Sequence, residues 1–257
     1  MFRAEMPRVY ELRDLIEDPG DARACFPNFD KYIRDNDPSL NSMKQAWLAY
    51  DREFQRLDAT SWQHLKDDAR PNLTEFDRKK GRGQEQLMSI LNHARAYNYL
   101  VDQGCSQVRF VSRAKKPGQE TPDLEGELNG RKVLCEVKTF HISEDEVARQ
   151  QAGSGGSTTN LLDEKFFYGK LKPTLCKAQS QMESYDGSDN AKRFAFMVVN
   201  FDDPGGEYKA EYFAQIDRWL AVDLFPGIDI VFYNQRTTFH KHVFMRHAHV
   251  INEPIQC

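Results

Sequence analysis

The sequence lacks the patterns of several common protein classes. Its five cysteines are widely spaced and include no Cys-x-x-Cys pair, so we expect neither a disulfide framework nor a zinc finger. No apolar run is long enough to span a membrane, and the charged N-terminal residues do not form a signal peptide. Together these absences predict a cytoplasmic protein in a reducing compartment, with no membrane partner.

Further absences narrow the possible functions. The chain has no internal repeats and no glycine-rich phosphate-binding loop of the usual kind. Its net charge of −4 argues against broad, non-specific nucleic-acid binding, but it is compatible with a local basic groove. We assign no zinc site to the two His-x-His pairs near the C-terminal end, because no cysteine or acidic partner stands at a matching spacing: His240, His242, His247 and His249.

The chain contains enough material for one large domain or two small ones. It has 257 residues, of which 40% are hydrophobic and 29% are charged, as in ordinary globular proteins. Apolar residues at helical spacing over 9–17 and 43–57 predict a helical N-terminal extension, which we place at residues 1–80. We assign residues 81–257 to a second domain that carries the functional motifs.

The second domain is predicted to be α/β, with a mixed central β-sheet flanked by helices. Residues 193–201 are almost continuously apolar, which is typical of a strand buried on both faces. Pro173 is expected to separate two helices, because proline lacks a backbone N–H group. We expect helices at 84–103, 161–171, 174–185 and 208–222, and strands at 107–113, 193–201 and 228–233, besides a β-hairpin at 122–138.

The β-hairpin at 122–138 carries the most informative pattern. Asn129-Gly130 favours a type I′ turn, because both residues tolerate a positive φ angle. Counting outward from this turn predicts these opposed pairs: Leu128 and Arg131, Glu127 and Lys132, Gly126 and Val133, Glu125 and Leu134, Leu124 and Cys135, and Asp123 and Glu136.

Side chains of a hairpin alternate between its two faces. One face is expected to meet the core, because most of its side chains are apolar: Leu124, Gly126, Leu128, Val133, Cys135 and Val137. The other face is mostly charged, and Glu127 and Lys132 are expected to form a cross-strand ion pair on it. Its residues are Asp123, Glu125, Glu127, Lys132, Leu134, Glu136 and Lys138.

Two carboxylates, those of Asp123 and Glu136, are predicted to lie directly opposite each other on the charged face. Like charges at this spacing repel, and a divalent cation between them removes the repulsion. Hard cations such as Mg²⁺ take oxygen ligands, typically one or two carboxylates with waters and substrate phosphates. Lys138 follows Glu136 by two residues on the same face, where it can stabilise phosphate charge or orient an attacking water.

These residues carry a resemblance to a known family. Pro122-Asp123, a hairpin turn and then Glu136-Val137-Lys138 resemble the signature of the PD-(D/E)xK nuclease superfamily. The resemblance implies a restriction-endonuclease-like core, and the expected order of elements is consistent with it. It also implies that Asp123 and Glu136 bind Mg²⁺ or Mn²⁺ and that Lys138 orients or activates the water that hydrolyses a phosphodiester.

The same resemblance implies two further site residues. A glutamate of the first helix often joins the metal site in this superfamily, so Glu85 is a candidate third metal ligand. Its alternative role is to stabilise the start of that helix through the helix dipole. Gln181, in Gln181-x-x-x-Tyr185, resembles a motif of helicase-linked members that holds the metal-site water or the nucleic-acid strand. The alternative is an ordinary amphipathic helix.

We therefore expect a metal-dependent endonuclease that acts on DNA rather than RNA, alone, as a homodimer or with a partner protein. One competing interpretation is a non-catalytic nucleic-acid-binding or assembly module that retains the nuclease fold. A second is an enzyme acting on another phosphate ester, and a third is an edge strand whose charged residues only face solvent. The presence of both acids and the lysine favours the nuclease.

Overall fold

The structure is a computed structural model that describes residues 2–16, 38–74, 85–112, 120–141, 162–200, 208–222, 225–234 and 243–248. These residues form two compact units, and the division falls within one helix, between Asn98 and Tyr99. The predicted boundary at residue 80 and the side chains of the histidine pairs lie outside the described part. Among the described residues, no helix is long and apolar enough to cross a membrane.

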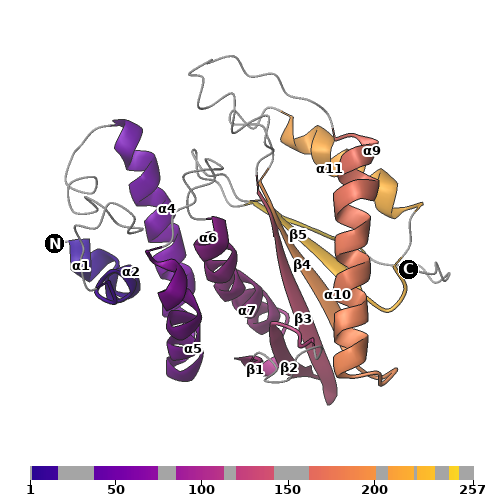
Figure 1. Ribbon diagram of the computed structural model, residues 1–257, viewed down its shortest axis with the longest axis horizontal. Helices are drawn as coiled ribbons and strands as arrows, with labels where there is room; N and C mark the ends of the chain where they lie inside the picture. The colour runs from indigo at the N-terminus through magenta and orange to yellow at the C-terminus, as the bar shows by residue number, and fades with distance from the viewer. Residues whose placement is uncertain are drawn as a thin grey trace. The chain divides into compact units, whose positions relative to one another are not determined.

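The first unit is mainly helical where it is described, as the N-terminal pattern predicts (Figure 1). Aromatic residues of α4 recur at helical spacing, and the ring of Phe54 lies 5.2 Å from that of Trp62 on α5. The helices are α1 (Phe2–Glu5), α2 (Pro7–Arg13), α4 (Pro38–Gln55), α5 (Ala59–Ala69), the 3₁₀ turn Arg70–Asn72, α6 (Glu85–Leu91) and the first part of α7 (His93–Asp102).

The helix predicted at 84–103 is divided at Asn92 into α6 and α7. Asn92 is fully buried, and its side-chain oxygen accepts hydrogen bonds from Arg95 at 2.6 Å and from the Tyr50 hydroxyl at 3.2 Å. An asparagine side chain that bonds locally competes with the regular helical ladder. The interruption therefore depends on a tyrosine of α4, which the local sequence of 84–103 does not contain.

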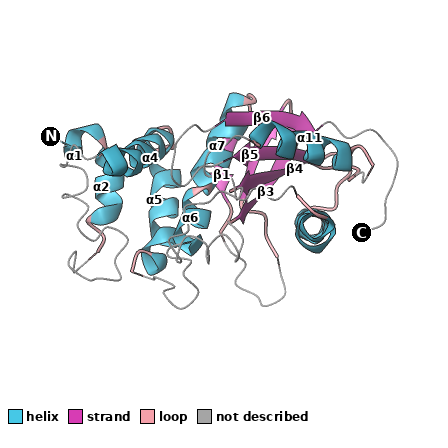
Figure 2. Ribbon diagram, turned by 90° about the horizontal axis from the view of Figure 1, so that it is seen from above, coloured by secondary structure: helices cyan, strands magenta, loops and turns pink. Residues whose placement is uncertain are grey.

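The second unit is built on a six-stranded mixed sheet with strands in sequence order, so the α/β fold with a mixed sheet is confirmed (Figures 1 and 2). The pairs β1–β2, β2–β3 and β5–β6 are antiparallel, whereas β3–β4 and β4–β5 are parallel. The strands are β1 (Ser106–Phe110), β2 (Leu124–Leu128), β3 (Arg131–Phe140), β4 (Lys192–Val199), β5 (Asp229–Asn234) and β6 (Val243–Ala248).

The β2–β3 hairpin has the predicted turn and register. Asn129 and Gly130 have φ angles of 52° and 75°, as a type I′ turn requires. All predicted pairs from Leu128–Arg131 to Leu124–Cys135 are observed. The ladder ends there, because Asp123 lies in a bend and its backbone N–H donates to the carbonyl of Cys135 at 3.1 Å. The predicted ladder pair between Asp123 and Glu136 is therefore wrong.

Helices cover one face of the central strands. The crossover from β3 to β4 contains α9 (Glu164–Phe166), a π-helical turn (Phe167–Leu171) and α10 (Lys172–Tyr185), and α11 (Lys209–Leu220) follows β4. Pro173 lies in the first turn of α10 and does not break the helix, which contradicts the prediction. The wider π turn before it changes the backbone pairing at the point where a proline in a regular helix would clash with a carbonyl.

The central strands are buried on both faces. Leu134 of β3 and alternate residues of β4 and β5 pack against α10 and α11 in one apolar cluster. On the other face, Phe194 and Phe196 of β4 lie 6.0 and 5.6 Å from the ring of Tyr99. The prediction of a strand buried on both faces is confirmed for β4. The charged face of the hairpin is also covered, because α10 lies against β3 (Figure 1).

Candidate active site

The predicted site residues of the second unit converge where the bend before β2, strand β3 and helix α10 meet. Asp123 lies in the bend, Glu136 and Lys138 lie on β3, and Gln181 lies on α10, which Figure 1 shows running alongside β3. We call these four residues the Glu136 cluster. Gln181 is distant from the others in sequence, and the β3–α10–β4 crossover brings it to them.

Glu136 is the centre of this cluster. Its side chain is only 2% exposed, although the sequence pattern placed it on a charged face. Lys138 Nζ donates to Oε1 of Glu136, and Gln181 Nε2 donates to Oε2 at 2.9 Å. Gln181 Nε2 also donates to the carbonyl of Thr121, two residues before Asp123. Each oxygen of the buried Glu136 carboxylate therefore accepts a hydrogen bond from a side chain, one from Lys138 and one from Gln181.

Asp123 lies beside Glu136, although it is outside the strand ladder. Its Oδ2 accepts a hydrogen bond of 2.7 Å from the backbone N–H of Val137, which follows Glu136 on β3. Burial and the nearby Asp123 carboxylate raise the pKa of Glu136 to about 8, while Lys138 and Gln181 act in the opposite direction. The carboxylate of Asp123 therefore lies at the backbone next to Glu136, although the two residues are not a ladder pair.

The donor set of the cluster fits a hard divalent cation. Two repelling carboxylates with a common neighbour supply the oxygen ligands that Mg²⁺ and Mn²⁺ prefer, and one or two carboxylates suffice when water and substrate phosphate complete the coordination. Within the described residues, no group of three or more His, Cys, Asp or Glu side chains is arranged to hold a metal. Asp123 and Glu136 are the two residues of the Glu136 cluster that would hold such a cation.

Glu85, the fifth predicted site residue, belongs to the first unit. It is the first residue of α6 and is partly buried, and its carbonyl accepts a hydrogen bond of 2.9 Å from the Ser89 hydroxyl. Its position at the start of a helix agrees with the dipole interaction considered from the sequence. Its role as a metal ligand stays a prediction.

A second polar cluster lies on the same face of the hairpin, and sequence reasoning missed it. The Glu125 carboxylate accepts hydrogen bonds of 2.9 and 2.7 Å from Arg109 and one of 3.2 Å from the Tyr185 hydroxyl. It also forms an ion pair with Lys132 at 3.7 Å. Lys132 also contacts Asp186 at 3.1 Å. We call these five residues the Glu125 cluster. The register of β1 against β2, which places Arg109 opposite Glu125, was the signal that could have revealed it.

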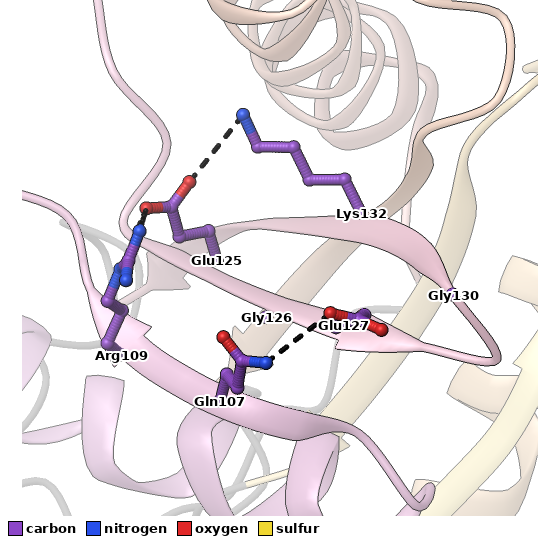
Figure 3. Close-up of a pocket in the computed structure, with 7 residues that line it drawn as sticks. All are labelled: Gln107, Arg109, Glu125, Gly126, Glu127, Gly130 and Lys132. Carbon is purple, nitrogen blue, oxygen red and sulfur yellow. Dashed lines mark hydrogen bonds and ion pairs between the residues drawn. The ribbon is translucent and has the colours of Figure 1, made fainter.

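The Glu125 cluster borders a shallow hollow at the β1–β2–β3 edge of the sheet (Figure 3). The predicted Glu127–Lys132 ion pair is not the contact formed, because Lys132 reaches Glu125 and Asp186, while Glu127 lies 3.5 Å from Gln107. Register alone placed Glu127 opposite Lys132 correctly. The long Lys132 side chain instead forms ion pairs with Glu125 on β2 and with Asp186 just after α10.

Comparison with protein-family models, curated proteins and solved structures found no match to this chain.

Proposed function

We propose that this chain is a metal-dependent nuclease that hydrolyses phosphodiester bonds in DNA, with a restriction-endonuclease-like core of the PD-(D/E)xK type. One observation carries the proposal: a fully buried carboxylate, Glu136, lies beside a second carboxylate and is contacted by both Lys138 and Gln181. These are the residue types that the motif requires, and they are brought together from three separate elements.

Fold stability does not explain this arrangement. Burying an ionisable group costs free energy, either in desolvating its charge or in keeping it protonated, and apolar residues of similar volume often serve the fold equally well or better. The neighbouring residue Leu134, on the same face of β3, shows what the core accepts there, since it is fully buried in the apolar cluster beneath α10. A second acid beside Glu136 adds to the cost, which supports a functional reason for retaining both.

Each residue has a distinct role in the proposed reaction. A cation held by Asp123 and Glu136 would act as a Lewis acid toward the phosphate. Gln181 fixes the orientation of the Glu136 carboxylate. Lys138 is 28% exposed, so its ammonium group can orient the attacking water and stabilise charge on the phosphate oxygens. The water oxygen attacks phosphorus and gives up one proton to solvent, the bond from phosphorus to the leaving oxygen breaks, and the leaving oxygen takes one proton from solvent.

Cleavage of linear, circular and single-stranded DNA in the presence of Mg²⁺ or Mn²⁺ tests the proposal. We expect Lys138→Ala and Asp123→Ala to reduce the rate by at least about 100-fold, the usual effect of removing a preorganised charge-stabilising group. Lys132→Ala is the matched control, because Lys132 lies on the same strand and face but contacts Glu125 and Asp186. Thermal unfolding of each variant establishes that it is folded.

Two results would count against the proposal. Cleavage that survives both substitutions would remove these residues from the active site. Absence of metal-dependent cleavage by the wild-type chain on every DNA form would favour the non-catalytic binding module.

A further inference from the structure

The middle of the crossover helical segment, between Glu164 and Glu183, has a charge composition unlike that of the whole chain. Residues 165–182, which include the π turn and most of α10, contain four lysines and no acidic residue, whereas the chain has a net charge of −4. Positive charge is thus concentrated on one helical segment of a net acidic protein. Such local concentration is the electrostatic feature expected of a surface that binds a polyanion.

Three of these lysines point their charges toward solvent. Lys165, Lys170 and Lys177 are exposed, and Lys177 is 63% exposed with one ion pair of 3.6 Å to Glu120. Lys177 and Gln181 are four residues apart on α10, which places them on a common side of that helix. The basic surface therefore continues along α10 toward the Glu136 cluster.

An aromatic ring accompanies the lysines. Tyr168 is 50% exposed. Its ring centre lies 6.1 Å from that of Trp219, and the two rings pack edge to face. Lys172 Nζ lies 5.8 Å from the centre of the Tyr168 ring. These contacts hold the ring in place while leaving half of its surface open to solvent. An ordered, exposed aromatic ring flanked by lysines provides a stacking surface for an unpaired base.

The local backbone is also unusual. Tyr168 lies in the π turn Phe167–Leu171, and such turns are rare and frequently occur at functional sites. Gly169 follows it, although a Cβ there would meet only Lys165 Cγ at an ordinary 3.7 Å. Packing therefore does not explain a residue that weakens helices. Close approach of a ligand to the backbone beside Tyr168 does explain it.

From these observations we infer that the exposed side of residues 165–177 binds single-stranded nucleic acid. Lys165, Lys170 and Lys177 would contact phosphates, and the ring of Tyr168 would stack on an unpaired base. The inference rests on the proposed function in one respect: it makes this strand the substrate that reaches the Glu136 cluster along α10. Lys170 and Gln181 are eleven residues apart, which corresponds to roughly 16 Å along a helix.

Equilibrium binding in a chelator tests the inference independently of cleavage. Fluorescence anisotropy would be measured with a labelled oligothymidylate and with a duplex of the same length, over a range of salt concentrations. We expect the double variant Lys165→Gln, Lys170→Gln to bind the single strand more weakly and to reduce the slope of log K against log salt by about 1.4. We expect Tyr168→Ala to weaken single-strand binding by about 5-fold to 100-fold, and Tyr168→Phe to retain it.

The matched control is the double variant Arg52→Gln, Arg70→Gln, which removes the same charge from exposed residues of the first unit. Binding in a chelator is measured without cleavage, so loss of single-strand binding overturns this inference, whereas loss of metal-dependent cleavage with binding retained overturns only the proposed function. The inference is overturned if the wild-type chain does not bind the single strand, or if the Lys165/Lys170 variant binds as wild type does. It is also overturned if the control variant loses as much affinity, or if Tyr168→Ala weakens duplex binding equally.

Discussion

The Glu125 cluster and the Glu136 cluster lie on the same face of the β2–β3 hairpin and meet the same helix, but they differ in how their charges are balanced. Glu125 and Asp186 face two cations, Arg109 and Lys132. In the other cluster the almost fully buried Glu136 pairs with Lys138, and the partly buried Asp123 lies beside it. The same helix serves both, through Tyr185 on Glu125 and Gln181 on Glu136.

This difference is the reason why we assign a structural role to the Glu125 cluster and propose a catalytic role for the Glu136 cluster. In the Glu125 cluster the acids are already paired with cations, so a bound metal ion would gain little electrostatic energy there. In the Glu136 cluster a second carboxylate lies beside a buried one, and a divalent cation would remove the repulsion between them. Position in the hairpin alone does not distinguish the two, because both clusters follow the same alternation of side chains.

The largest effect is expected from removing the equivalent carboxylate in each cluster. Glu136→Gln should reduce metal-dependent cleavage by about 1,000-fold or more, because it removes a ligand charge at the reacting phosphate. Glu125→Gln should leave the rate within a few-fold of wild type. Steady-state cleavage by both variants under identical metal concentrations makes the comparison. Equal losses would show that the two clusters do not differ in function.

The pH dependence of stability should differ between the wild-type chain and Glu136→Gln. The pKa of Glu136 is raised in the folded protein from an ordinary 4.5 to about 8, so between these values the folded chain retains a proton that the unfolded chain has lost. Stability from this group is therefore fully present below about pH 4.5 and is lost as pH rises through 8, by up to about 1.4 kcal/mol per pH unit. Denaturant midpoints in a chelator should fall with rising pH for wild type, and less steeply for Glu136→Gln. Parallel pH profiles would contradict this.

Metal binding should stabilise the wild-type fold. At a Mg²⁺ or Mn²⁺ concentration 100 times the dissociation constant, linkage predicts about 2.7 kcal/mol of added stability. We expect this gain in thermal unfolding of wild type and of Glu125→Gln, and its loss in Asp123→Asn. A gain of the same size in Asp123→Asn would place the cation elsewhere.

The smallest effect is expected in the Glu125 cluster itself. Arg109 is 68% exposed, and exposed ion pairs typically contribute between 0 and about 1 kcal/mol. Arg109→Ala should therefore lower the free energy of unfolding by less than about 1 kcal/mol, and by less still at high salt. A loss of several kcal/mol in urea titrations would mean that this network is essential to the fold.

Local patterns predicted the parts of the structure that depend on neighbouring residues. Asn129-Gly130 specifies its turn because few residue pairs accept two positive φ angles, and the register of the β2–β3 ladder follows by counting. The apolar run of β4 requires burial on both faces for a similar reason, since no alternation leaves a polar side for water.

Predictions failed where distant residues decide the outcome. Asp123 lies outside the ladder, where its backbone N–H donates to the Cys135 carbonyl and its carboxylate accepts from the backbone N–H of Val137, contacts that simple alternation does not include. Lys132 reached Asp186 at the end of α10 instead of Glu127 across the strand. Pro173 was expected to separate two helices. The helical segment instead runs through the π turn into α10, whose first turn contains Pro173.

The sequence by itself determined the hairpin, its register, the buried strand and the presence of two acids and a lysine at nuclease-like spacing. Only the tertiary structure decided that Glu136 is buried and that Gln181 contacts it, because both depend on α10, more than 40 residues further along the chain, packing on β3. Turn geometry and alternation are local properties of the backbone. Burial and charge balance are set by whichever element covers the strand, and that element is chosen by the whole core.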